Sequence, residues 1–163
     1  MQFLKYFYTQ LLSSDIPFWK YCLLAYIAAA IPSLILLNIQ SLIIDYFKLA
    51  LPMPPLHDST WQTFLKGGLI GPAIETLLLI LTIMLVKKFT PNILVISISV
   101  GILWGAAHGM QSLIWIGNTA WYFYIFSIAY FTWLPKSFIK AYFAATVPHI
   151  MINLSAFAYD LFF

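Results

Sequence analysis

The chain has 163 residues, of which 63% are hydrophobic and only 8% are charged, so it has too few polar side chains to cover a soluble surface. Its net charge of +3 comes from lysines spread over the ends of apolar runs, a distribution that excludes a nucleic-acid-binding patch. The single cysteine, Cys22, excludes an internal disulfide and any CxxC site. Because several apolar runs approach or exceed the roughly 20 residues that span a bilayer, we predict an all-α, polytopic membrane protein with one domain, residues 1–163.

The first predicted element is a short amphipathic helix at the N-terminus. Within residues 1–16, Phe3, Phe7 and Leu11 recur at helical spacing. This pattern is typical of a helix that lies in the membrane interface. Asp15 is expected to cap the helix that follows.

Five apolar runs follow, and each is predicted to be a transmembrane helix. A polar, proline-rich loop containing His57 separates the first two, and His57 is expected to be a solvated loop residue. The fourth run is dense in Tyr, Phe and Trp, as is typical of helices that reach the membrane interface. The approximate bounds of the runs are 18–44, 64–86, 91–113, 118–134 and 135–159.

The lysines predict the orientation of these spans. With a cytoplasmic N-terminus, only Lys48 and Lys66 fall on the outer side. The cytoplasmic side then carries Lys5, Lys20, Lys87, Lys88, Lys136 and Lys140. This asymmetry favours five spans with the N-terminus in the cytoplasm.

Polar side chains that are rare in membranes occur in three of the runs. Glu75, the only glutamate of the chain, lies in the second run, His108 in the third, and His149 with Asn153 in the fifth. An ionisable group in hydrocarbon costs roughly 2.5–3.5 kcal/mol on insertion scales, so such residues usually have a function. Given the alternating directions of the helices and a rise of about 1.5 Å per residue, all four are expected at similar depth from one membrane face. We therefore predict that they share one cavity.

Small residues lie beside these polar groups. Gly101, Gly105 and Gly109 form a GxxxGxxxG pattern next to His108, which permits close helix packing. Ala141 and Ala145 lead to His149 at intervals of four residues, and Gly67 and Gly71 lead to Glu75 in the same way. The polar residues are thus predicted to face other helices rather than lipid. A simpler alternative is that they are polar packing contacts only.

Three segments resemble the motifs of the CPBP intramembrane proteases, which include the type II CAAX prenyl endopeptidases and bacterial Abi-type membrane proteases. GPAIETLLLI resembles the first motif, EExxxR; WGAAH resembles the second, FxxxH; and HIMIN resembles the third, HxxxN. The resemblance covers residues 65–159, with the motifs in the family order. The first motif is degenerate, because Thr76 replaces the second glutamate and Ile80 the arginine, and Trp104 stands at the phenylalanine position of the second.

The resemblance implies an intramembrane endopeptidase in a bacterial cell membrane, acting on a membrane-associated peptide or protein. Glu75, assisted by His108, would activate water, while His149 and Asn153 would stabilise the oxyanion. No cofactor is expected. The alternative is a zinc site formed by Glu75, His108 and His149, which would leave no second carboxylate as the base.

Two other functions compete with proteolysis. A non-catalytic relative would bind a membrane peptide as an immunity or scaffold protein, which the missing Glu and Arg of the first motif favour. A transporter or channel subunit would need a continuous polar path, whereas the predicted polar groups gather at one depth. Asn38, Gln40 and Asp45 are expected to be polar groups at a membrane interface or helix end rather than site residues.

Overall fold

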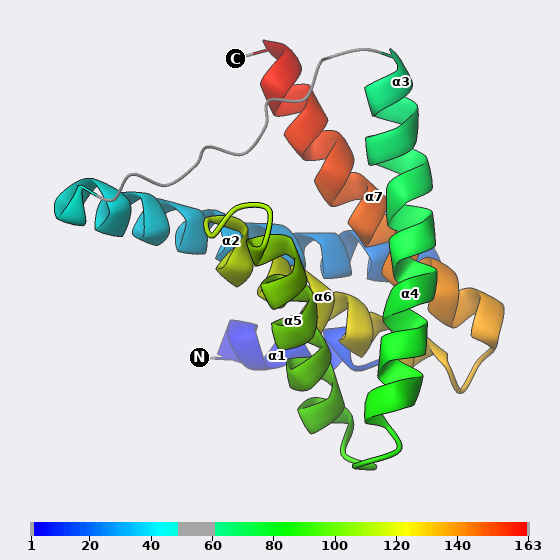
Figure 1. Cartoon of the computed structure of the whole chain (residues 1–163). Helices are drawn as coiled ribbons and strands as arrows, with labels where there is room; N and C mark the ends of the chain where they lie inside the picture. The colour runs from blue at the N-terminus through cyan, green and yellow to red at the C-terminus, as the bar shows by residue number, and fades with distance from the viewer. Residues whose placement is uncertain (1, 49–60, 163) are drawn as a thin grey trace.

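The structure, a computed structural model, describes residues 2–48 and 61–162, so the predicted loop residue His57 lies outside the described residues. All secondary structure in the described ranges is helical, which confirms the all-α prediction. Figure 1 shows how the helices are arranged in space. They are α1 (Gln2–Leu11), α2 (Phe18–Phe47), α3 (Trp61–Thr63), η1 (Phe64–Ile70), α4 (Gly71–Val86), α5 (Ile93–Gly109), α6 (Trp115–Trp133) and α7 (Phe138–Phe162).

Three helical stretches in the described ranges are long and apolar enough to cross a membrane. They are Phe18–Phe47, the continuous helix Trp61–Val86, and Phe138–Tyr159. α5 is also apolar but has only 17 residues, and α6 is not among the three. The chain thus has the helices of a membrane protein.

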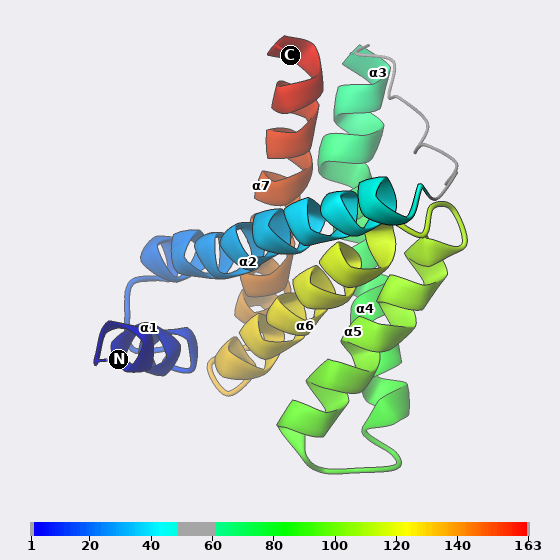
Figure 2. The same ribbon diagram turned by 90° about the vertical axis from the view of Figure 1, so that its left-hand side faces the viewer.

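α6 is the central helix of the fold. It packs against α2, α4, α5 and α7, and Figure 2 shows it between α2 and α5. Phe123 and Phe126 are almost fully buried, as are Ile125, Ala129 and Trp133. The aromatic residues of this run were expected near the membrane interface, but the structure places several of them in the core because neighbouring helices surround α6.

α2 does not run parallel to the other long helices. It crosses the directions of α4 and α7 steeply in both views (Figures 1 and 2). It continues through Pro32 as a single helix of 30 residues. The prediction that Asp15 caps this helix is wrong: Pro17 occupies the N-cap position without a side-chain cap, and Asp15 instead lies 3.5 Å from the ammonium group of Lys136.

The α4–α5 and α6–α7 connections, which carry lysines, lie with the α1–α2 connection at one end of the molecule. The Asp15–Lys136 contact joins the α1–α2 and α6–α7 connections. Lys87, at the end of α4, lines a pocket together with Pro135 of the α6–α7 connection. Lysines that the sequence assigned to the same membrane side are therefore close in space.

The glycine pattern of α5 packs closely against α6. A Cβ atom built on Gly105 would lie 2.7 Å from the Ile116 carbonyl oxygen and 2.8 Å from the Ala120 Cβ. Gly101 and Gly109 face α6 in the same way. The prediction of close packing along this pattern is confirmed, because only glycine lets the two backbones approach so closely.

The corresponding pattern before Glu75 does not pack as expected. Gly67 has open space around its Cβ position, and a Cβ on Gly71 would meet only Lys66 of its own helix. Gly68 instead faces α7: a Cβ atom built on it would lie 2.7 Å from Cδ2 of Leu154. The reason is the π-helical segment η1, whose wider turn rotates the preceding residues out of a four-residue repeat.

We expect Gly105→Ala to lower the free energy of unfolding by about 1–3 kcal/mol, because the added methyl group must push α5 away from α6. Gly67→Ala is the matched control, since its methyl group enters open space. It should leave stability unchanged or increase it, by up to about 1 kcal/mol. Thermal unfolding in detergent, followed by circular dichroism, measures both; equal losses would contradict this account of the α5–α6 contact.

Candidate functional site

The carboxylate predicted to act as the base meets an imidazole between α4 and α7. Glu75 Oε2 lies 3.3 Å from His149 Nε2. The His149 side chain is only 5% exposed, and that of Glu75 is 34% exposed. The pair therefore combines one fully enclosed ring with one carboxylate that an external molecule can reach.

Thr76 contacts the other side of the His149 ring. Its hydroxyl donates to the Pro72 carbonyl oxygen, within its own helix, at 2.7 Å. The same oxygen lies 3.5 Å from His149 Nδ1. Because the hydroxyl hydrogen is already directed to Pro72, the Thr76 oxygen can only accept from His149, which places a hydrogen on Nδ1. The contact between His149 Nε2 and Glu75 then contains one shared proton.

Two phenylalanines of α6 hold the His149 ring. Phe126 stacks on it with ring centroids 4.7 Å apart, and Phe123 meets it edge-on at 5.3 Å. The sequence interpretation missed both residues as part of the site. Their spacing of three places them on one face of a helix, which is the signal that could have identified them.

His108 approaches the pair from α5. Its Nδ1 donates to the Trp104 carbonyl oxygen at 3.0 Å, because a carbonyl can only accept. Nε2 of the neutral ring is therefore a proton acceptor. The ring lies 5.7 Å from that of Phe123, which contacts both imidazoles.

Asn153 contacts the backbone rather than Glu75. Its Nδ2 donates to the Gly67 carbonyl oxygen at 3.0 Å. In the π-helical pattern the Gly71 N–H donates to the Lys66 carbonyl oxygen, five residues earlier. The N–H of the next residue would donate to the Gly67 carbonyl oxygen, but that residue is Pro72, which has no N–H. Asn153 supplies the missing donor and keeps one amide hydrogen for another acceptor.

The structure brings two of the three residues of the zinc alternative into contact. Across residues 2–48 and 61–162, no three His, Cys, Asp or Glu side chains gather closely enough to hold a metal ion. Glu75 and His149 are close, and His108 meets the ring of Phe123, which also contacts His149. A catalytic zinc ion usually has three protein ligands, so the zinc alternative stays a prediction.

A pocket of about 190 Å³ lies between α4 and α5. Thr82, Leu103, Trp104 and Ala107 line it. Trp104 also stacks on Phe123 at 4.3 Å and accepts the hydrogen bond of His108. The tryptophan thus connects this largely apolar pocket to the histidines of the site.

No family model, curated protein or solved structure matches the chain. The resemblance to the CPBP proteases therefore depends on the three motifs and on how their residues lie in space. Of the four predicted site residues, Glu75 and His149 are in contact, His108 meets the Phe123 ring that also contacts His149, and Asn153 is bonded to Gly67.

We expect Asn153→Ala to lower the free energy of unfolding by about 1–3 kcal/mol, because it leaves the Gly67 carbonyl of an apolar helix without a donor. Asn38→Ala is the matched control: Asn38 also donates to a carbonyl, that of Leu34, but this carbonyl lies within the uninterrupted α2. Its loss should cost less than about 0.5 kcal/mol. Chemical unfolding in detergent measures the difference, and equal effects would argue against the bond to Gly67 as a structural requirement.

Proposed function

We propose that the protein is an intramembrane endopeptidase of the CPBP type that hydrolyses a peptide bond of a membrane-associated substrate. The observation that carries the proposal is the 3.3 Å contact between Glu75 and His149 from two apolar helices, with His108 against the Phe123 ring that also contacts His149. A carboxylate with two imidazoles inside an apolar fold is costly without a chemical role.

The Glu75 carboxylate is the base in this proposal. With the shared proton on His149, Oε1 of Glu75 accepts a proton from water while the water oxygen bonds to the substrate carbonyl carbon. Nε2 of His108 accepts a hydrogen bond from the same water and orients it. When the carbon–nitrogen bond breaks, Glu75 returns its proton to the leaving amine, so that the glutamate is unchanged after a cycle.

Two donors are available for the oxyanion that forms during the attack. Asn153 keeps one amide hydrogen after bonding Gly67, and the Nε2–H of His149, which Glu75 accepts at rest, becomes available to the oxyanion once the Glu75 carboxylate has taken the water proton. Their spacing of four residues on α7 places them on one face. Donors fixed in this way stabilise the developing charge more than water does, because they need no reorganisation.

The substrate is proposed to be a membrane-embedded or membrane-anchored peptide. The pocket between α4 and α5 offers space for an apolar side chain beside Trp104, one helical turn from His108. The exposed apolar residues of α4 and α5 surround this pocket, including Leu81 and Leu103. A lipid-soluble segment would therefore meet apolar surface before it reaches Glu75.

The proposed topology has five spans in a bacterial cell membrane, with the N-terminus in the cytoplasm. The grouping of Lys87, Lys136 and the α1–α2 connection at one end supports this orientation. α2 lies crosswise, but its 30 residues measure roughly 45 Å at 1.5 Å per residue. That length crosses a core of about 30 Å even when the helix is tilted by about 45°.

The rival proposal is a non-catalytic protein that binds a membrane peptide. It is favoured by the bond between Asn153 and Gly67, which gives one predicted catalytic residue a structural partner. Peptide binding would need the pocket beside Trp104 but not the Glu75 carboxylate as a base. The two proposals therefore differ in what a change at Glu75 does.

Glu75→Gln is expected to reduce cleavage about 10²- to 10⁴-fold while the fold is kept, because the amide has nearly the same shape but cannot accept the proton. The assay is cleavage of a library of apolar peptides by protein in liposomes, read by mass spectrometry. Asp45→Asn, an exposed acidic residue near the end of α2, is the matched control and should retain activity. Peptide binding by both variants is measured in parallel.

Unchanged cleavage by the Glu75→Gln protein would disprove the catalytic role. Binding without any cleavage by the unaltered protein would support the rival. Metal analysis of the purified protein is an independent check: one tightly bound zinc per chain, required for cleavage, would contradict the metal-free mechanism.

A further inference from the structure

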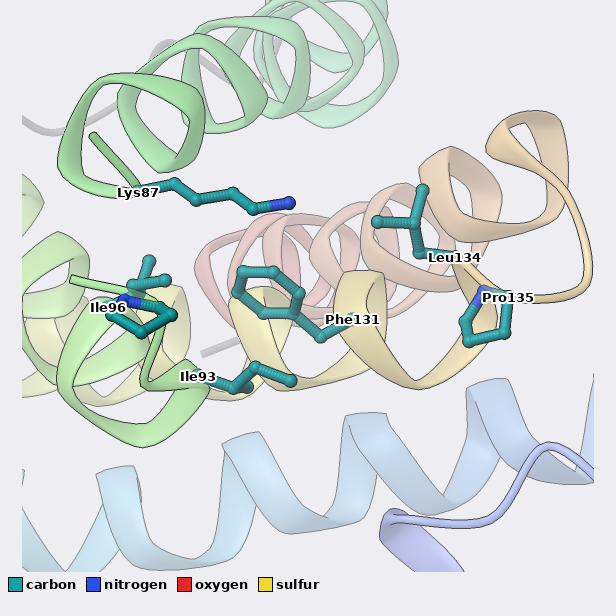
Figure 3. A pocket seen from close by; sticks show the side chains of 7 residues that line it. Lys87, Ile93, Ile96, Phe131, Leu134 and Pro135 are labelled. Atoms are coloured by element: carbon teal, nitrogen blue, oxygen red, sulfur yellow. The ribbon is translucent and has the colours of Figure 1, made fainter.

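A second pocket, of about 310 Å³, lies far along α4 from Glu75, at the end that carries the α4–α5 and α6–α7 connections. α5 contributes Ile93 and Ile96 to it, and α6 contributes Phe131. Lys87 extends from the end of α4 toward these apolar side chains (Figure 3). The pocket is therefore amphipathic, with a cation beside an apolar surface.

Lys87 is the one charged side chain among the described residues that line this pocket. The ion pairs found among the described side chains, Asp15–Lys136 and Glu75–His149, do not include Lys87. An ammonium group at this position is available to an anion from outside the chain. The exposed Lys88 and Lys140 add to the positive potential at the same end of the molecule.

Two prolines fix the rim of the pocket. Pro91 precedes α5 and Pro135 follows α6, and both line the pocket. Proline has a restricted φ and no backbone N–H, so the rim is rigid and provides no hydrogen-bond donor at these positions. Recognition of an anion must therefore come from the Lys87 side chain.

We propose that this pocket binds an anionic phospholipid, with the phosphate at Lys87 and an acyl chain against Ile93, Ile96 and Phe131. A volume of about 310 Å³ corresponds to roughly ten water molecules, which accommodates a substantial part of an acyl chain. A free phosphate would use the lysine but leave the apolar lining without a partner. The lipid satisfies both halves of the pocket, and lysines near a membrane surface attract acidic lipids.

The test compares lipids and lysines in the full chain, purified in nonionic detergent. Phosphatidylglycerol or phosphatidylcholine is titrated in, with thermal stability and native mass spectrometry as readouts. We expect phosphatidylglycerol to bind more tightly than phosphatidylcholine, and Lys87→Gln to weaken its binding about fivefold, the equivalent of about 1 kcal/mol per lysine. Lys88→Gln, at the neighbouring residue that does not line the pocket, should change binding less than twofold.

Three further arms make the result decisive. Lys87→Arg keeps the charge and should retain the binding, which separates the loss of charge from a loss of folding. Ile93→Trp fills the apolar part and should weaken the binding of both lipids. Glycerol phosphate, which has no acyl chain, should not stabilise the protein. Equal losses for Lys87→Gln and Lys88→Gln, equal affinity for the two lipids, or full stabilisation by glycerol phosphate would each overturn the proposal.

Discussion

The contact between Glu75 and His149 is the constraint on which the rest of the structure depends. Burying an isolated carboxylate or imidazolium in an apolar fold costs several kcal/mol. A carboxylate and an imidazole that share a proton lower this desolvation cost for each other. The contact requires α4 and α7 to keep a fixed register, since it joins side chains that are 74 residues apart in the chain. Ala141 and Ala145, two turns and one turn before His149, are fully buried, and Phe123 and Phe126 contact the His149 ring.

A second constraint acts on the backbone before α4. A carbonyl without a donor is costly in an apolar environment, and Pro72 removes the donor that the π-helical turn needs. Asn153 provides it from α7, four residues beyond His149. One face of α7 therefore supports α4 at two levels, through a side-chain contact at Glu75 and a backbone contact at Gly67. Both contacts hold the same pair of helices, so the polar groups serve the fold as well as the proposed chemistry.

The sequence predicted the helices, the membrane character and the meeting of Glu75 with His149, because apolar length and rare polar residues are strong local signals. It also predicted the glycine contact of α5, since a repeat of four needs only a regular helix. It failed before Glu75, where the π-helical turn rotates Gly67 and Gly71 away from the expected face. The aromatic residues Phe123 and Phe126 were not recognised as part of the site, because composition cannot distinguish a helix surrounded by other helices from one with ends in the interface. The crosswise path of α2 has no signature in a run of apolar residues.

The packing explains two positions at which the chain differs from the CPBP motif that it resembles. Thr76, at the position of the second glutamate, is fully buried, and its hydroxyl is bonded to Pro72. Ile80, at the arginine position, is 4% exposed and belongs to the apolar core. A charge at either position would need an opposite charge nearby, and the two substitutions remove both members of such a pair at once. The hydroxyl oxygen of Thr76 lies 3.5 Å from His149 Nδ1. A neutral hydroxyl can therefore position the imidazole from the place that a glutamate has in the motif. The degenerate motif is thus consistent with a site that relies on one carboxylate, Glu75, and holds its histidine partner with uncharged groups.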